Sequence, residues 1–314
     1  FMPQSGTMAL WQMPSQLRVE DALQSGGEIP PYYDSMIAKL IGHGDTRDAA
    51  RRQLMAGLED AVALGVKTNQ AFLNRCLGHL VFAAGGATTA FIAQNQEALL
   101  APDTATQARA AAIAAVLLYE TAPGRPPATT GRRMIHSLPI SLRFELDGGA
   151  LSAGIVSTRR GHFDVSIGER THAIELEEIG EHTARVACDG LCERVAFHRD
   201  SAALLMQYRG VPVRVEDKTR AATARQGDAG GDGKVRASMN GRVVAVLAAI
   251  GDRVEAGQPV LTLEAMKMEH IHAAPVGGRL TALHVQVGDQ VSASRIVAEI
   301  EVAGAAEGAR PLRA

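Results

Sequence analysis

Residues 241–264, GRVVAVLAAIGDRVEAGQPVLTLE, align without gaps on residues 278–301, GRLTALHVQVGDQVSASRIVAEIE, at an offset of 37. Nine of the 24 positions are identical, and many others exchange Val, Leu and Ile. The identical pairs are Gly241/Gly278, Arg242/Arg279, Ala245/Ala282, Gly251/Gly288, Asp252/Asp289, Val254/Val291, Ala256/Ala293, Val260/Val297 and Glu264/Glu301. Each copy holds short strands broken by a Gly-Asp turn, so neither copy alone can cover its apolar face. Two copies packed together can, which predicts a small β-sandwich with pseudo-twofold symmetry.

The segment that joins the two copies, residues 264–277, is expected to form a hairpin that displays Lys267 at one end. Lysine is rare in this chain, with five lysines against 27 arginines. Guanidinium stays protonated at any accessible pH, whereas an ammonium group can lose its proton and become a nucleophile. Position 267 therefore indicates attachment of a carboxylic-acid cofactor through an amide. The alternative is an ordinary exposed lysine in a turn.

Two methionines, Met266 and Met268, flank this lysine at a tip where polar residues are expected. Exposed, flexible thioethers are more typical of a recognised surface. The stretch EAMKME, residues 264–269, resembles the Ala-Met-Lys-Met signature of biotin carboxyl carrier domains, and the resemblance extends over residues 236–302. One departure is Asn240, where many members of that family have proline before glycine.

This resemblance implies that a biotin protein ligase biotinylates Lys267, with Ala265, Met266 and Met268 as its recognition residues. It also implies that the ureido nitrogen of biotin carries CO₂. Lipoyl domains share the fold and the position of the lysine but usually show Asp-Lys-Ala, so methionine on both sides favours biotin.

The N-terminal segment resembles the closing part of a biotin carboxylase domain. The stretches that carry the resemblance are residues 1–6, Arg18-Val19-Glu20, residues 30–40 (PPYYDSMIAKL) and residues 65–69 (GVKTN). In that family an arginine at the position of Arg18 contacts the biotin ureido group and stabilises its enolate, which is electrostatic stabilisation of developing charge. The alternative is a surface arginine on a loop, and the family's Gly-rich approach is replaced by Pro14-Ser15-Gln16.

Three helices are expected before residue 120. Asp45 is expected to cap the first helix, whose apolar residues recur at helical spacing until Gly65 ends it. A second helix is expected from an Asn69 cap through Leu77. A third is expected to begin at Thr104, with Gln107 completing a capping box, and to extend to about Tyr119.

After a Pro- and Gly-rich linker at 121–130, the hydrophobic period changes from 3.6 to 2. Alternating runs at 140–146, 163–167, 184–186 and 211–215, separated by turn signals, predict an antiparallel barrel or sandwich. By its order and strand pattern, this part is similar to the helix-plus-barrel domain that contacts the carboxyltransferase β subunit in acyl-CoA carboxylases.

These features together predict a multidomain α+β protein. The expected division is a helical and α+β end of a biotin carboxylase domain at 1–100, a helix plus antiparallel barrel at 101–217, a flexible tether at 218–235, a biotinyl β-sandwich at 236–302 and a tail at 303–314. The tether would let a carrier visit two active sites.

Composition excludes several other functions. A formal net charge of −2 and 4% aromatic residues argue against nucleic-acid or membrane-surface binding. Three cysteines without a C-x-x-C motif favour a reducing compartment. The resemblance implies a bacterial cytoplasm or, in a eukaryote, a mitochondrial matrix. No apolar run reaches the roughly 18–20 residues of a membrane span. His270 and His272 share one face of a strand but lack further ligands, so we expect two solvated histidines and no metal.

The resemblance implies the C-terminal part of a biotin-dependent acyl-CoA carboxylase α subunit, of the methylcrotonyl-CoA or geranyl-CoA type rather than the propionyl-CoA type. Its partners would be a carboxyltransferase β subunit carrying the acyl-CoA substrate and a biotin protein ligase. The start at Phe1 suggests a cut inside a longer protein, and MgATP and bicarbonate would bind upstream. These 314 residues alone are expected neither to hydrolyse ATP nor to carboxylate free biotin. A stand-alone biotin carrier module and a lipoyl carrier remain the alternatives.

Overall fold

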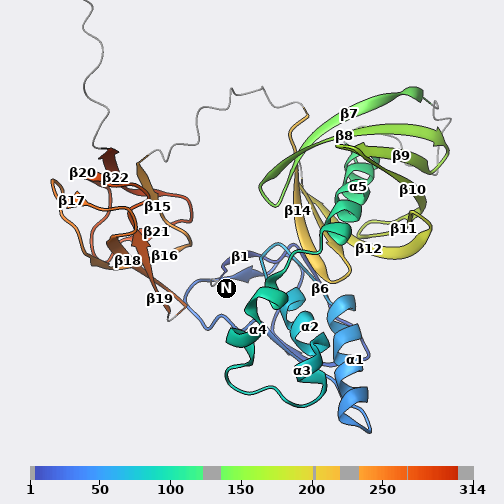
Figure 1. The fold of residues 1–314 in the computed structure, drawn as a ribbon, viewed down its shortest axis with the longest axis horizontal. Helices are drawn as coiled ribbons and strands as arrows, with labels where there is room; N and C mark the ends of the chain where they lie inside the picture. The colour runs from blue at the N-terminus through green and yellow to red at the C-terminus, as the bar shows by residue number, and fades with distance from the viewer. Residues whose placement is uncertain (1–3, 123–135, 201–202, 220–232, 267, 303–314) are drawn as a thin grey trace, which may run out of the picture. The chain divides into compact units, whose positions relative to one another are not determined.

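The computed structural model describes residues 4–122, 136–200, 203–219, 233–266 and 268–302. The chain divides into two compact units, each with its own core. One unit comprises residues 1–6, 28–37 and 224–314, and the other comprises residues 7–27 and 38–223. Helices and antiparallel sheets both occur among the described residues, which confirms the predicted multidomain α+β class (Figure 1). Lys267, most of the expected tether and linker, and the tail lie outside the described residues.

The helices before residue 101 differ from the sequence expectations mainly at their ends. They are α1 (Arg47–Asp60), α2 (Gln70–Gly78), α3 (Leu80–Ala83) and α4 (Phe91–Leu100), of which the last two were not predicted. Thr46, not Asp45, caps α1, since its hydroxyl accepts the N–H of Ala49 at 3.1 Å. The helix ends at Asp60 rather than near Gly65, because residues 62–64 form a strand.

The strands before residue 65 are short: β1 (Gly6–Thr7), β2 (Leu10–Gln12), β3 (Arg18–Asp21), β4 (Glu28–Ile29), β5 (Ala38–Ile41) and β6 (Val62–Leu64). β2 pairs with β6 and β3 pairs with β5, both antiparallel. The expected helix after Asn69 is confirmed, although the Asn69 side chain makes no capping hydrogen bond.

Eight strands form a closed antiparallel barrel in the order β10-β11-β12-β13-β14-β7-β8-β9. They are β7 (His136–Leu146), β8 (Gly149–Arg159), β9 (His162–Ile167), β10 (Arg170–Ile179), β11 (Thr183–Cys188), β12 (Leu191–Asp200), β13 (Ala203–Tyr208) and β14 (Val211–Asp217). Of the two predicted architectures, barrel and sandwich, the chain therefore forms the barrel. Closure removes the exposed strand edges that a sandwich would leave.

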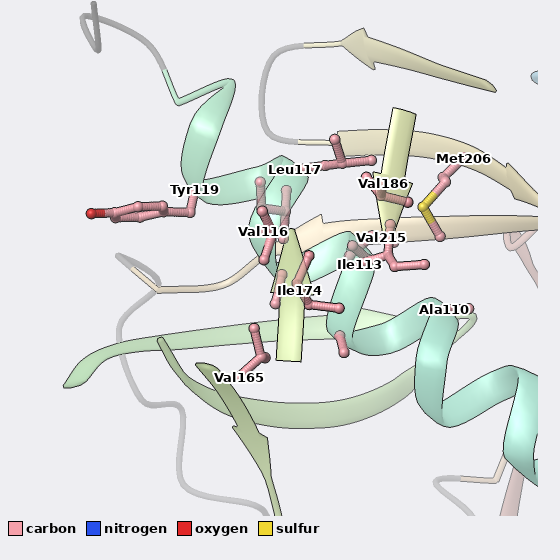
Figure 2. Packing of buried hydrophobic residues seen from close by; sticks show 14 of the residues in the cluster. Ala110, Ile113, Val116, Leu117, Tyr119, Val165, Ile174, Val186, Met206 and Val215 are labelled. Atoms are coloured by element: carbon pink, nitrogen blue, oxygen red, sulfur yellow. The ribbon is translucent and has the colours of Figure 1, made fainter. Parts of the chain in front are cut away.

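Helix α5 (Thr104–Glu120) lies inside this barrel (Figure 1). All of residues 110–120 are buried. Ile113 and Val116 point among Ile174, Val186 and Val215 of the surrounding strands (Figure 2). A helix that is apolar on every side is stable only when it is buried on every side. Its alanines leave room for the strand side chains, so the Ala-rich composition suits the inside of a barrel.

The cap of α5 also differs from the expectation. Asp103, not Thr104, is the N-cap residue, and its carboxylate accepts the N–H of Thr106 at 3.0 Å and the hydroxyl of Thr106 at 2.7 Å.

Among the helices of the described residues, none combines the length and the apolar character needed to cross a membrane.

The C-terminal part contains two four-stranded sheets, β15-β22-β20-β17 and β19-β18-β16-β21. The strands are β15 (Lys234–Arg236), β16 (Gly241–Val246), β17 (Arg253–Val254), β18 (Pro259–Ala265), β19 (Met268–Ala273), β20 (Gly278–Leu283), β21 (Gln290–Val291) and β22 (Ile296–Val302). The bounds of β16, β17 and β18 shifted by 37 give those of β20, β21 and β22. The predicted pseudo-twofold sandwich is therefore confirmed.

Candidate functional site: the β18–β19 hairpin

The segment that joins the two copies forms the predicted hairpin. β18 and β19 pair antiparallel, with Glu264 opposite Glu269 and Ala265 opposite Met268. This register leaves two residues between the strands, which is the shortest common hairpin connection. Met266, the first of them, has a φ of 48°, as the favoured two-residue turns require. Met266 is the turn residue that the structure describes, and Lys267 follows it in the sequence.

The residues beside Lys267 differ in exposure. Met268 is 42% exposed, as expected for a recognised surface. Met266 is only 5% exposed, so the expectation of an exposed thioether is wrong at this position. The N–H of Met266 donates to the carbonyl of Pro31 at 3.0 Å, within the same compact unit. Ala265 is buried as well, which leaves Met268 as the accessible member of the three predicted recognition residues.

The two histidines that follow on β19 share one face, as predicted, but they are not both solvated. His272 is 7% exposed, and its Nε2 lies 2.9 Å from both the backbone N and the hydroxyl of Ser238. Its Nδ1 lies 3.2 Å from the carbonyl of His270. Burial lowers the pKa of His272 below its usual value. The expectation of a solvated histidine is therefore wrong for His272, which has partners within its own domain.

Asn240, the departure from the carrier signature, has a structural role in the same domain. Its carbonyl oxygen accepts the N–H of Ala293 at 2.7 Å. A proline has no side-chain polar group and could not make this contact between the two copies of the repeat.

Arg18 lies on β3, opposite Ile41 of β5. Its side chain is 72% exposed, and its Nε donates to the carboxylate of Glu20 at 2.7 Å. Arg18 and Glu20 thus form an exposed ion pair on one strand. Tyr32 and Tyr33 of the PPYYDSM stretch are also strongly exposed. An exposed arginine with one carboxylate partner has donors available for a ligand.

One cluster of potential metal ligands occurs among the described residues, at the β11–β12 end of the barrel. His172, Cys188 and Asp189 place their ligand atoms within 4.8 Å of one another. Asp189 is already engaged, because its carboxylate lies 2.8 Å from Nδ1 of His172 and accepts the N–H of Ala173 at 3.0 Å. Burial raises the pKa of the Cys188 thiol to about 12, so the thiolate that binds metals is disfavoured. We assign these three side chains a structural role.

Two protein families match separate parts of this chain. The family described as "Biotin carboxylase C-terminal domain" matches residues 1–94, and the family described as "Biotin-requiring enzyme" matches residues 233–300. The second match contains the whole β18–β19 hairpin. This chain therefore contains a biotin carboxylase C-terminal domain and a biotin-requiring enzyme domain. Its cofactor is therefore biotin, as the sequence predicted.

Curated relatives extend the similarity across both matched parts of the chain. It is 29% identical to "Methylcrotonoyl-CoA carboxylase subunit alpha, mitochondrial" of Dictyostelium discoideum, over 88% of this chain and 43% of the relative. It is 30% identical to the protein of the same name from Oryza sativa subsp. japonica, over 88% of this chain and 44% of the relative. It is 28% identical to "Propionyl-CoA carboxylase alpha chain" of Ruegeria pomeroyi, over 81% of this chain and 39% of the relative. The predicted resemblance to acyl-CoA carboxylase α subunits is thus confirmed, and this chain spans less than half the length of these relatives.

Proposed function

We propose that Lys267 is the biotinylated residue of this chain. The observation that carries the proposal is the sequence EAMKME in a hairpin whose register leaves two residues in the turn. Such a turn fits a covalently attached group, because its strands are held by β18–β19 pairing while the turn itself lies at their end. Biotin, when bound, supplies a ureido nitrogen that carries a carboxyl group. Lys267 would hold it through an amide, and the accessible Met268 would contribute most to recognition by a biotin protein ligase, with Ala265 and Met266 fixing the turn.

The proposed activity is that of the C-terminal part of an acyl-CoA carboxylase α subunit. Its partner would be a carboxyltransferase β subunit, and its acyl substrate 3-methylcrotonyl-CoA or geranyl-CoA. The relatives named for methylcrotonoyl-CoA cover 88% of the chain, which supports this substrate over propionyl-CoA, whose named relative covers 81%. MgATP and bicarbonate would be used in a part of the relatives that this chain does not span. A cytoplasmic location in a bacterium, or a matrix location in a mitochondrion, stays a prediction.

Arg18 would contribute electrostatic stabilisation to negative charge on the ureido group. Its strand position and its exposed guanidinium support this role. The match at residues 1–94 also favours a carboxylase over a lipoyl carrier, because a lipoyl carrier has no use for a biotin carboxylase domain.

The test is the intact mass of the full chain after co-expression with a biotin protein ligase, with biotin and lipoate supplied. We expect a mass increase of one biotin, its loss in Lys267→Arg, and its retention in the matched control Lys39→Arg. Lipoylation, or a label that survives Lys267→Arg, would overturn the proposal. Capture of a β subunit that carboxylates 3-methylcrotonyl-CoA would then test the substrate.

A further inference from the structure

The strand that leaves the Lys267 turn is held on one side only by its sheet. β19 is the end strand of the order β19-β18-β16-β21, so among the described strands β18 is its one hydrogen-bonded neighbour. On β19, His272 reaches across to Ser238, in the segment between β15 and β16 of the same domain. A single buried side chain therefore ties this edge strand to the segment that opens the first copy of the repeat.

Both ring nitrogens of His272 have defined roles. Nε2 faces the backbone N–H of Ser238 at 2.9 Å, and a backbone N–H can only donate. Nε2 must therefore be the acceptor, which makes Nδ1 the protonated nitrogen that donates to the carbonyl of His270 at 3.2 Å. The geometry thus requires a neutral imidazole. A second proton would remove the acceptor and leave the Ser238 N–H facing another donor.

The other copy of the repeat shows what this pair replaces. At the offset of 37, His272 corresponds to Val235, which is 3% exposed, and Ser238 corresponds to Pro275. Proline has no backbone N–H, so the second copy has no donor at this place and an apolar valine can fill it. In the first copy the Ser238 N–H is the donor, and Nε2 of His272 is the acceptor opposite it. His272, on the hairpin that carries Lys267, and Ser238 are thus both polar, whereas the corresponding residues Val235 and Pro275 are both apolar.

We propose that His272 is a positioning residue. Its hydrogen bond to Ser238 holds β19, the strand that follows the biotinyl-lysine turn, in its register. The proposal rests on the proposed function of Lys267, because its purpose is to present a modified side chain from a fixed hairpin. The charged and titratable residues on the strands that contact β19 are Lys234 and Arg236 of β15 and Glu264 of β18. On β19 itself they are Glu269 and His270, and the charge of His270 disfavours protonation of His272.

The repeat itself supplies the variants that test this. In the full chain, His272→Val leaves the Ser238 N–H without its acceptor, whereas His272→Val with Ser238→Pro recreates the pair of the second copy. We expect β19 amides to exchange with solvent roughly fivefold faster in His272→Val, from the loss of one net hydrogen bond. The double variant should return exchange towards the wild-type rate. His284→Val removes a histidine from the other half and should leave β19 unchanged.

The positioning role predicts a second readout. The initial rate at which a biotin protein ligase modifies Lys267 should fall in His272→Val and recover in the double variant, under conditions in which all variants are folded. Unchanged β19 exchange, no recovery in the double variant, or an unchanged ligation rate would each overturn the proposal. Hydrogen exchange needs no biotin, so a chain that is never biotinylated would refute the proposed function without affecting the exchange result.

Discussion

Gly257 and Ser294 occupy the same place in the two copies of the repeat and share a left-handed backbone. Their φ angles are 86° and 68°, and each N–H donates to the equivalent carbonyl of the opposite copy. Gly257 bonds Ala274 at 2.8 Å, and Ser294 bonds Ala237 at 2.7 Å. The same left-handed turn therefore occurs in both copies. The second copy has Ser294 at this position, where glycine is favoured.

Ser294→Gly is expected to stabilise the C-terminal β-sandwich (β15–β22, the proposed carrier domain) by roughly 0.5–1 kcal/mol. The change relieves a left-handed conformation that costs about 1–2 kcal/mol, and part of this gain is lost because the unfolded chain becomes more flexible. Chemical denaturation of the full chain, followed by a signal from the carrier domain, measures this. Gly257→Ser is the matched reverse change and should destabilise. Equal stability of the two variants would show that the turns are not equivalent.

The stability of the carrier domain should fall in mild acid. Burial holds the pKa of His272 below its usual value, so the unfolded chain takes up the proton at a higher pH than the folded chain does. The contribution is fully present above the unfolded pKa of about 6.5 and is lost as the pH falls towards the folded pKa. Denaturation midpoints between neutral pH and about pH 5 measure the slope. His272→Val should flatten it, whereas an unaltered slope would assign the effect to other groups.

Much of the carrier domain could be predicted from sequence because its information is local and duplicated. The offset of 37 between Gly241 and Gly278 reproduces strand bounds across both copies. The buried state of His272 was missed, since a histidine in an alternating strand indicates a face but not what covers it. The same offset of 37, extended to Val235 and Pro275, is the sequence signal that could have predicted the burial of His272.

The ends of the helices were predicted less well than their presence, because two adjacent residues can both suit the N-cap position. Asp45 and Thr46 both suit an N-cap, and only the backbone decides which side chain meets the first free N–H groups. Thr46→Ala should therefore destabilise the unit containing α1 by about 1 kcal/mol, whereas Asp45→Ala should change the free energy of unfolding by less than about 0.5 kcal/mol. Equal losses in urea denaturation would restore Asp45 as the cap.

The place of α5 inside the barrel could not be predicted from its composition. An Ala-rich helix has high propensity in any setting, and the closure of β7–β14 around it depends on contacts between residues far apart in sequence. Burial on every side makes Ile113 a sensitive position. Ile113→Ala should cost about 2–5 kcal/mol, and Ile92→Ala on the exposed part of α4 should cost far less. Thermal unfolding of both variants measures the difference, and similar losses would argue against a barrel packed around α5.

Arg18 allows chemistry to be separated from stability. Its one ion-pair partner, Glu20, is half-exposed, and an exposed pair contributes about 0–1 kcal/mol. Arg18→Ala should therefore leave folding and Lys267 biotinylation nearly unchanged. In a complete carboxylase, however, it should lower kcat for the biotin-dependent step by a factor on the order of 100 or more, the scale for losing one electrostatic stabiliser of developing charge. Arg18→Lys keeps the charge but not the forked donor geometry, so it should recover activity only in part. Steady-state kinetics of the assembled enzyme measure this loss, with Arg52→Ala on α1 as the control for an exposed arginine. A wild-type kcat in Arg18→Ala would show that Arg18 is an ordinary surface arginine.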